Sequence, residues 1–194
     1  ATCAAAAAQL PQQPALAMQP AAAAAASNIP QADAAIISIV LTGGPCAGKS
    51  SSLELIKTHF EAHGFRVMII KENATEVFGM AGSFEPAWAG TAAVMQVQTA
   101  LGKAQLAQED TAMAFAKLHQ GKGPQLLIHD RGVIDGAAFC TDATQWEHVL
   151  RELGADRCSD FFLRYDIVVH LETVAKLGDG HLYQFGADSS NPKR

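Results

Sequence analysis

Short apolar runs alternate with longer stretches of helical periodicity from residue 34 onward. The short runs are rich in β-branched side chains and have the length of buried strands in a parallel sheet. They predict strands at 35–41, 65–70, 125–129 and 166–171.

Helical patterns lie between these runs. Residues 49–63 carry apolar side chains at helical spacing and are followed by Gly64, a residue that commonly ends helices. Further helices are expected at about 91–119 and 145–153. Strands that alternate with helices in this way form βαβ units. We therefore predict an α/β fold of three layers, with a parallel sheet and helices on both faces.

The start of the chain has a different composition. Residues 1–32 contain no Asp, Glu, Lys or Arg, and residues 1–30 contain 14 Ala. Prolines interrupt the alanine runs, so we expect a low-complexity tail over 1–33, either without fixed structure or with one docking helix. A single domain over 34–194 would follow this tail.

Charge and hydropathy narrow the possible partners. A formal net charge of −5 excludes a generally basic nucleic-acid coat protein, and no nucleic-acid partner is expected. No apolar run reaches the roughly 18 residues of a membrane span, so no transmembrane segment is predicted. The four cysteines form no CxxC pair, which favours reduced thiols in an intracellular protein, with the cytoplasm as the expected compartment and an organelle as an alternative.

The segment after the first expected strand has a nucleotide-binding pattern. Residues 43–50 read Gly-Gly-Pro-Cys-Ala-Gly-Lys-Ser, which matches G-x-x-x-x-G-K-[ST]. Such glycines let backbone N–H groups turn toward phosphate oxygens, and the following helix adds its positive dipole end. Lys49 is suited to binding the β- and γ-phosphates, and the Ser50 hydroxyl to binding Mg²⁺. The alternative interpretation of the motif is a glycine-rich turn with a surface lysine and no ligand. The expected nucleotide-binding residues are Gly43, Gly44, Pro45, Cys46, Ala47, Gly48, Lys49, Ser50 and Ser51.

Three further residues lie where strands are expected to end. Asp130 ends the third strand, as does the carboxylate that holds Mg²⁺ in many P-loop proteins, although such an Asp is also a common turn or capping residue. Arg131 is either a stabiliser of phosphoryl charge or a structural ion-pair partner. Glu72 ends the second strand, at the sheet edge where ligands bind in open α/β folds. It either handles an acceptor hydroxyl or is a charge at a helix N-terminus.

These segments together resemble one P-loop family. The residues that carry the resemblance are Leu41–Ser50, Glu72–Glu76, His129–Gly132 and Tyr165–Leu171. The family is often described as an AAA-type ATPase domain. It groups the nicotinamide riboside kinase domain of a bacterial NAD regulator with the TRPL-translocation-defect protein of insect photoreceptors, and its core is similar to nucleoside and nucleotide kinases.

The resemblance implies Mg²⁺-dependent binding of ATP, with GTP as an alternative, and a small-molecule kinase reaction. Glu72 and Thr75 would face the acceptor substrate, and Asp130 and Arg131 would hold Mg²⁺ and stabilise phosphoryl charge. The resemblance also places residues 191–194 at the start of an arginine-bearing lid, so we expect a domain without its lid and last strand.

Two other functions stay open at this point. One is a nucleotide-dependent binding module for a protein or membrane-surface partner, phosphoinositides included. The other is a structural subunit with a vestigial nucleotide site. Phe84 and Trp88 either line a substrate pocket or cap the core.

Overall fold

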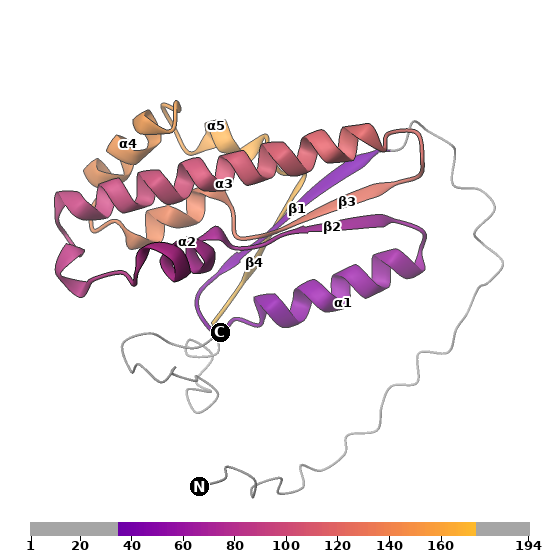
Figure 1. Cartoon of the computed structure of the whole chain (residues 1–194), viewed down its shortest axis with the longest axis horizontal. Helices are drawn as coiled ribbons and strands as arrows, with labels where there is room; N and C mark the ends of the chain where they lie inside the picture. The colour runs from indigo at the N-terminus through magenta and orange to yellow at the C-terminus, as the bar shows by residue number, and fades with distance from the viewer. Residues whose placement is uncertain (1–34, 174–194) are drawn as a thin grey trace, which may run out of the picture. The chain divides into compact units, whose positions relative to one another are not determined.

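The computed structural model describes residues 35–173. The predicted tail over 1–33 and the lid-like residues 191–194 lie outside this part of the chain. Within it, the element order confirms the expected alternation of strands and helices (Figure 1). The strands are β1 (Ile36–Gly43), β2 (Arg66–Ile70), β3 (Gln125–Asp130) and β4 (Ile167–Leu171).

The helices agree with the sequence pattern at most positions. Each long helix falls within two residues of the expected bounds, while the short elements after β2 and β3 and before β4 were not predicted. The α-helices are α1 (Lys49–Ala62), α2 (Asn73–Ala81), α3 (Ala92–Leu118), α4 (Ala143–Glu152) and α5 (Ser159–Phe162). Two 3₁₀ segments are η1 (Pro86–Trp88) and η2 (Val133–Phe139).

The described strands form one parallel sheet in the order β2-β3-β1-β4. Because all strands run in the same direction, their carboxyl ends meet at one edge of the sheet, next to the start of α1 and α2 (Figure 1). The register places Leu41 opposite Asp130, and Gly43 opposite Leu171. The functional segments predicted from the sequence therefore lie at a common edge.

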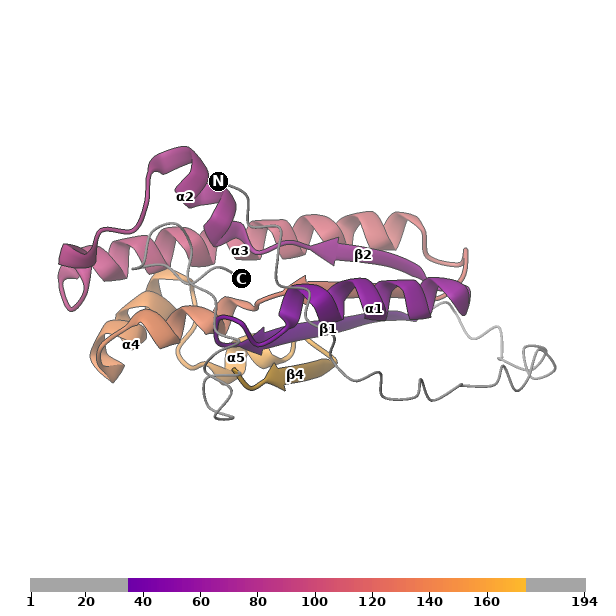
Figure 2. The ribbon, with the colours of Figure 1, turned by 90° about the horizontal axis from the view of Figure 1, so that it is seen from below.

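Helices cover both faces of the sheet, as expected for a three-layer α/β fold. On one face, Leu53 of α1 packs against Leu41 and Ile128. On the other, Ala116 of α3 packs against Leu127. Both helices run along the strands in the two perpendicular views (Figures 1 and 2). This packing confirms the predicted fold class.

A further apolar cluster lies beyond α3. Trp146, Val149 and Leu150 of α4 pack with Val133 of η2 and Phe161 of α5. This cluster anchors the segment that follows β3. Because Val133 follows Asp130 by three residues, this cluster also supports the backbone next to Asp130.

Candidate nucleotide-binding site

The loop between β1 and α1 has the backbone of a phosphate-binding turn. Gly43, Cys46 and Gly48 have positive φ angles of 135°, 54° and 81°. Gly48 is the N-cap of α1, and no side chain caps the helix there. Such a turn directs successive N–H groups inward, and the helix dipole adds positive charge. The backbone of this loop is therefore suited to an anion.

Lys49 lies folded over this loop. Its side chain is buried, and Nζ donates hydrogen bonds to the carbonyl oxygens of Gly43 at 2.9 Å and Gly44 at 2.7 Å. Carbonyl oxygens are weaker partners for an ammonium group than phosphate oxygens, which carry full negative charge. Lys49 is thus held within the loop, where a bound phosphate would become its stronger partner.

The end of β4 packs directly on the loop. A Cβ atom at Gly43 would lie 2.1 Å from the carbonyl oxygen of Leu171, which leaves no room for a side chain. Thr173 donates from its hydroxyl to the carbonyl oxygen of Pro45 at 2.8 Å. The loop is therefore fixed from both its own strand and the neighbouring one.

Asp130 lies at the end of β3, opposite Leu41 of β1. Its Oδ1 atom is buried and has no hydrogen-bond partner. Burial raises the pKa of this carboxyl, and the nearby charges of Lys49 and Arg131 lower it in part. A buried carboxylate oxygen without a donor is a suitable ligand for a hard cation. The residues present therefore fit Mg²⁺, with the exposed Ser50 as a second oxygen donor.

Glu72 and Arg131 form an ion pair at the same edge. Arg131 Nε lies 2.9 Å from Glu72 Oε1, and the two side chains are 13% and 7% exposed. Arg131 also donates from Nη1 to the carbonyl oxygen of Gly43 at 3.2 Å. Glu72 is the N-cap residue of α2, but its side chain makes no capping hydrogen bond. The pair joins the end of β2 to the phosphate-binding loop.

Asp135 at this site was missed by the sequence analysis. Asp135 accepts hydrogen bonds from the backbone N–H of Gly132, at 3.0 Å, and from the hydroxyl of Thr42. Asp135, not Asp130, thus caps the turn after β3 and ties it to the end of β1. An Asp three residues after Gly132, at the start of an apolar segment, is the signal that could have revealed it.

The remaining predicted residues lie around this edge. Ser51 is exposed at the start of α1, and Thr75 is exposed in the first turn of α2. Phe84 and Trp88 contact each other edge to face, with ring centroids 5.6 Å apart, and Phe84 contacts Phe78 of α2 in the same way. These aromatic side chains lie outside the described core clusters.

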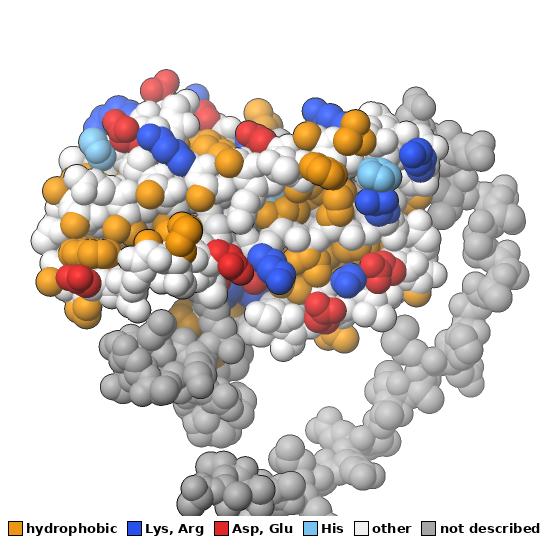
Figure 3. Space-filling model, viewed as in Figure 1, with side chains coloured by type: hydrophobic (Ala, Val, Ile, Leu, Met, Phe, Trp, Pro, Cys, Tyr) orange, Lys and Arg blue, Asp and Glu red, His pale blue; other side chains and the backbone are white. Residues whose placement is uncertain are grey.

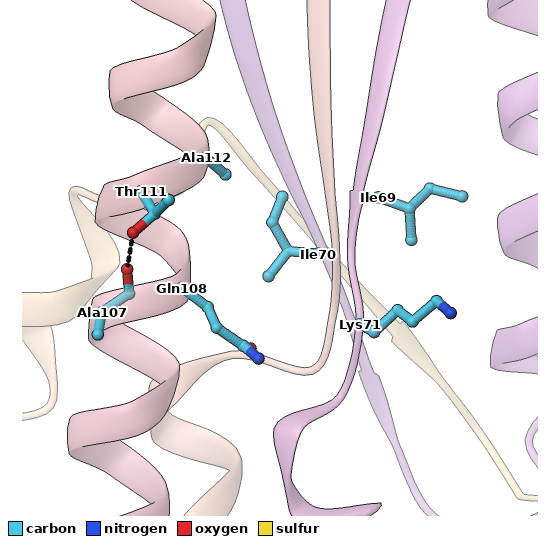
Figure 4. Close-up of a pocket in the computed structure, with 7 residues that line it drawn as sticks. All are labelled: Ile69, Ile70, Lys71, Ala107, Gln108, Thr111 and Ala112. Atoms are coloured by element: carbon cyan, nitrogen blue, oxygen red, sulfur yellow. Dashed lines mark hydrogen bonds between the residues drawn. The ribbon is translucent and has the colours of Figure 1, made fainter. Parts of the chain in front are cut away.

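An open groove lies elsewhere, between β2 and α3 (Figure 4). Its volume is about 430 Å³. It is lined by Ile69, Ile70, Lys71, Ala107, Gln108, Thr111 and Ala112, none of which was predicted as a site residue.

Figure 3 shows Lys and Arg interspersed with Asp and Glu over the face seen in Figure 1. Within residues 35–173, no helix is both long and apolar enough to cross a membrane.

Comparison with known families agrees with this geometry. A family model described as "AAA domain" matches residues 38–187, which is more than half of the chain. The chain belongs to the AAA domain family. The matched region of this AAA domain includes the phosphate-binding loop, the Glu72–Arg131 pair and Asp130, and it supports nucleotide binding of the P-loop type. Among curated proteins, none matches the chain.

Proposed function

We propose that the chain is a Mg²⁺-dependent, ATP-binding phosphotransferase that acts on a small hydroxyl- or phosphate-bearing acceptor. The observation that supports a kinase over a simple nucleotide-binding module is the buried Glu72–Arg131 pair. It brings an acidic side chain from the end of β2 next to the phosphate-binding loop. Such a group is suited to orienting an acceptor hydroxyl and accepting its proton in phosphoryl transfer, a role that nucleotide binding alone does not need.

The nucleotide would be held by residues Gly43–Ser51. Its phosphates would replace the carbonyl oxygens of Gly43 and Gly44 as partners of Lys49. The Ser50 hydroxyl and the Asp130 carboxylate would hold Mg²⁺, which when bound neutralises phosphate charge. Positive charge and inward N–H groups then supply most of the stabilisation that phosphoryl transfer needs.

The acceptor would bind on the α2 side of the loop. Glu72 would orient the acceptor and, where the acceptor group is a hydroxyl, accept its proton, and Thr75 of α2 would contact the acceptor. Arg131, already within 3.2 Å of the Gly43 carbonyl, would stabilise charge on the transferred phosphoryl group. The γ-phosphoryl group leaves ATP and forms a bond to the acceptor oxygen, so ADP and a phosphorylated acceptor are the products.

The test is ADP release from Mg·ATP with nucleosides and nucleoside monophosphates as acceptors. We expect at least one acceptor to accelerate ADP release, and Glu72→Gln to lower the accelerated rate by about 100-fold or more while Mg·ATP binding changes little. Glu76→Gln is the matched control, because Glu76 is exposed in the first turn of the same helix.

Two results would contradict the proposal. The first is tight binding of Mg·ATP with no acceptor-stimulated release, which supports a binding module instead. The second is equal activity in Glu72→Gln and wild type, which removes Glu72 from the reaction. Repeating the binding measurement with GTP tests the preference for ATP.

A further inference from the structure

A buried polar network connects α3 to the backbone that follows β3. Its centre is Glu109 of α3, whose side chain is 2% exposed. The Oε2 atom of Glu109 accepts from Arg164 Nε at 2.7 Å. Its Oε1 atom accepts from the Tyr165 hydroxyl at 2.8 Å and from Gln105 Nε2 at 3.0 Å. Nothing in the sequence pattern of α3 distinguishes Gln105 and Glu109 from residues on the exposed surface of a helix.

The Glu109 carboxylate fixes the direction of every hydrogen bond around it. A carboxylate only accepts, so Tyr165 gives Glu109 its single hydroxyl hydrogen. The tyrosine oxygen is then free to accept from the backbone N–H of Val133, at 3.0 Å. The Gln105 amide nitrogen carries two hydrogens. It therefore donates to Glu109 and also to the carbonyl oxygen of Arg131, at 3.3 Å from Nε2. Burial and the Glu109 charge raise the pKa of Tyr165, which keeps its hydroxyl protonated.

The network has two outer contacts, the hydrogen bonds of Gln105 to the Arg131 carbonyl oxygen and of Tyr165 to the Val133 N–H, and both fall on the segment that follows Asp130. Arg131 has a φ angle of 78°, a left-handed conformation that is unfavourable for a residue with a side chain. At Gly132, a Cβ atom would lie 2.9 Å from the Tyr165 hydroxyl oxygen. A strained turn in such close contact needs neighbours that hold it in place, and the network provides them.

We infer that Gln105, Glu109 and Tyr165 are positioning residues that set the Asp130 carboxylate against the phosphate-binding loop. They act through the backbone of residues 130–133 and touch neither nucleotide nor metal. This inference rests on the proposed Mg²⁺–nucleotide function. It makes α3 and the residues before β4 a support for the metal site.

The variants Tyr165→Phe and Gln105→Met each remove one outer contact with little change in side-chain volume. The first measurement is the Mg²⁺ concentration that gives half-maximal binding of a fluorescent ATP analogue. Because the loss of supporting hydrogen bonds around metal ligands typically costs about 10–100-fold in affinity, we expect this midpoint to rise about tenfold or more. Binding of the analogue in EDTA, which depends on the loop alone, should change by less than about twofold.

The second measurement needs no nucleotide or metal. Amide hydrogen exchange over residues 129–135 of the nucleotide-free protein should be about tenfold faster in Tyr165→Phe, because the Val133 N–H loses its partner. Two controls separate positioning from stability. Lys103→Ala, on the same helix as Gln105 and Glu109, removes an exposed ion pair with Glu152 of α4, and Phe65→Leu weakens packing at the opposite end of the sheet.

An unchanged Mg²⁺ midpoint in folded Tyr165→Phe and Gln105→Met overturns the inference. So does a midpoint that shifts equally in Phe65→Leu, since the effect is then general destabilisation. If Tyr165→Phe does not fold, Gln105→Met decides. A wild-type chain that binds no Mg·ATP overturns the proposed function instead, and the exchange data then decide whether the network holds residues 130–133.

Discussion

Gly43 is the position in the loop where the structure sets the strictest limit on the side chain. Its φ angle of 135° is rarely adopted by residues with a Cβ atom, at a cost of about 1–3 kcal/mol. An added Cβ would also lie 2.1 Å from the Leu171 carbonyl oxygen, which cannot move without disturbing the β1–β4 pairing. Overpacking of this kind costs about 1–3 kcal/mol. We therefore expect Gly43→Ala to lower the free energy of unfolding by about 3 kcal/mol or more.

Gly64→Ala is the matched control for backbone strain. Gly64 also has a positive φ angle, of 82°, but no atom lies within 4 Å of the added Cβ. Strain alone should then cost about 1–2 kcal/mol. Both values are measured by urea unfolding of the nucleotide-free protein. Equal losses in the two variants would refute the claim that β4 closes tightly on the loop.

Three further changes test the electrostatics and hydrogen bonds around the site. Burial raises the pKa of Asp130 above its ordinary value of 3.8, so the charged carboxylate destabilises the folded state as pH rises above 3.8. In urea unfolding, Asp130→Asn should therefore be more stable than wild type at neutral pH, and this advantage should disappear below pH 3.8. Burial lowers the pKa of His129 below 6.5, so wild type should lose stability as pH falls through 6.5 and below, and equal losses in His129→Gln would contradict this. Asp135→Ala leaves the Gly132 N–H and the Thr42 hydroxyl without their acceptor and should lower the free energy of unfolding by about 1–3 kcal/mol, with Asp142→Ala, which removes only an exposed helix cap, as the comparison.

The phosphate-binding loop could be predicted because its requirements are local. Glycines at fixed spacing, followed at once by Lys49, need only a strand before and a helix after, and both are visible in the hydrophobic pattern. The ends of β2 and β3 could be found in the same way, since Glu72 and Asp130 each follow an apolar run. That these ends meet at one edge follows from a parallel sheet.

The contacts between these residues could not be predicted. The ion pair of Glu72 with Arg131 depends on β2 and β3 being neighbours, and strand order is set by crossovers that the sequence does not display. Glu109 is a clearer case: it has Gln105 four residues before it, the spacing of an exposed helical pair. Its burial depends on Arg164 and Tyr165, more than 50 positions away in the chain.

The central claim is that the loop at residues 43–51 binds the phosphates of a nucleotide. It is tested most directly by isothermal titration of the chain with ATP in the presence of Mg²⁺, beside Lys49→Ala and Lys57→Ala. Lys57 lies on the same helix as Lys49, about two turns further from the loop, and controls for the loss of one positive charge. We expect micromolar binding in wild type and in Lys57→Ala, and a loss of about 100-fold or more in Lys49→Ala. Equal binding by all three proteins, or no binding by a folded wild type, would contradict the account.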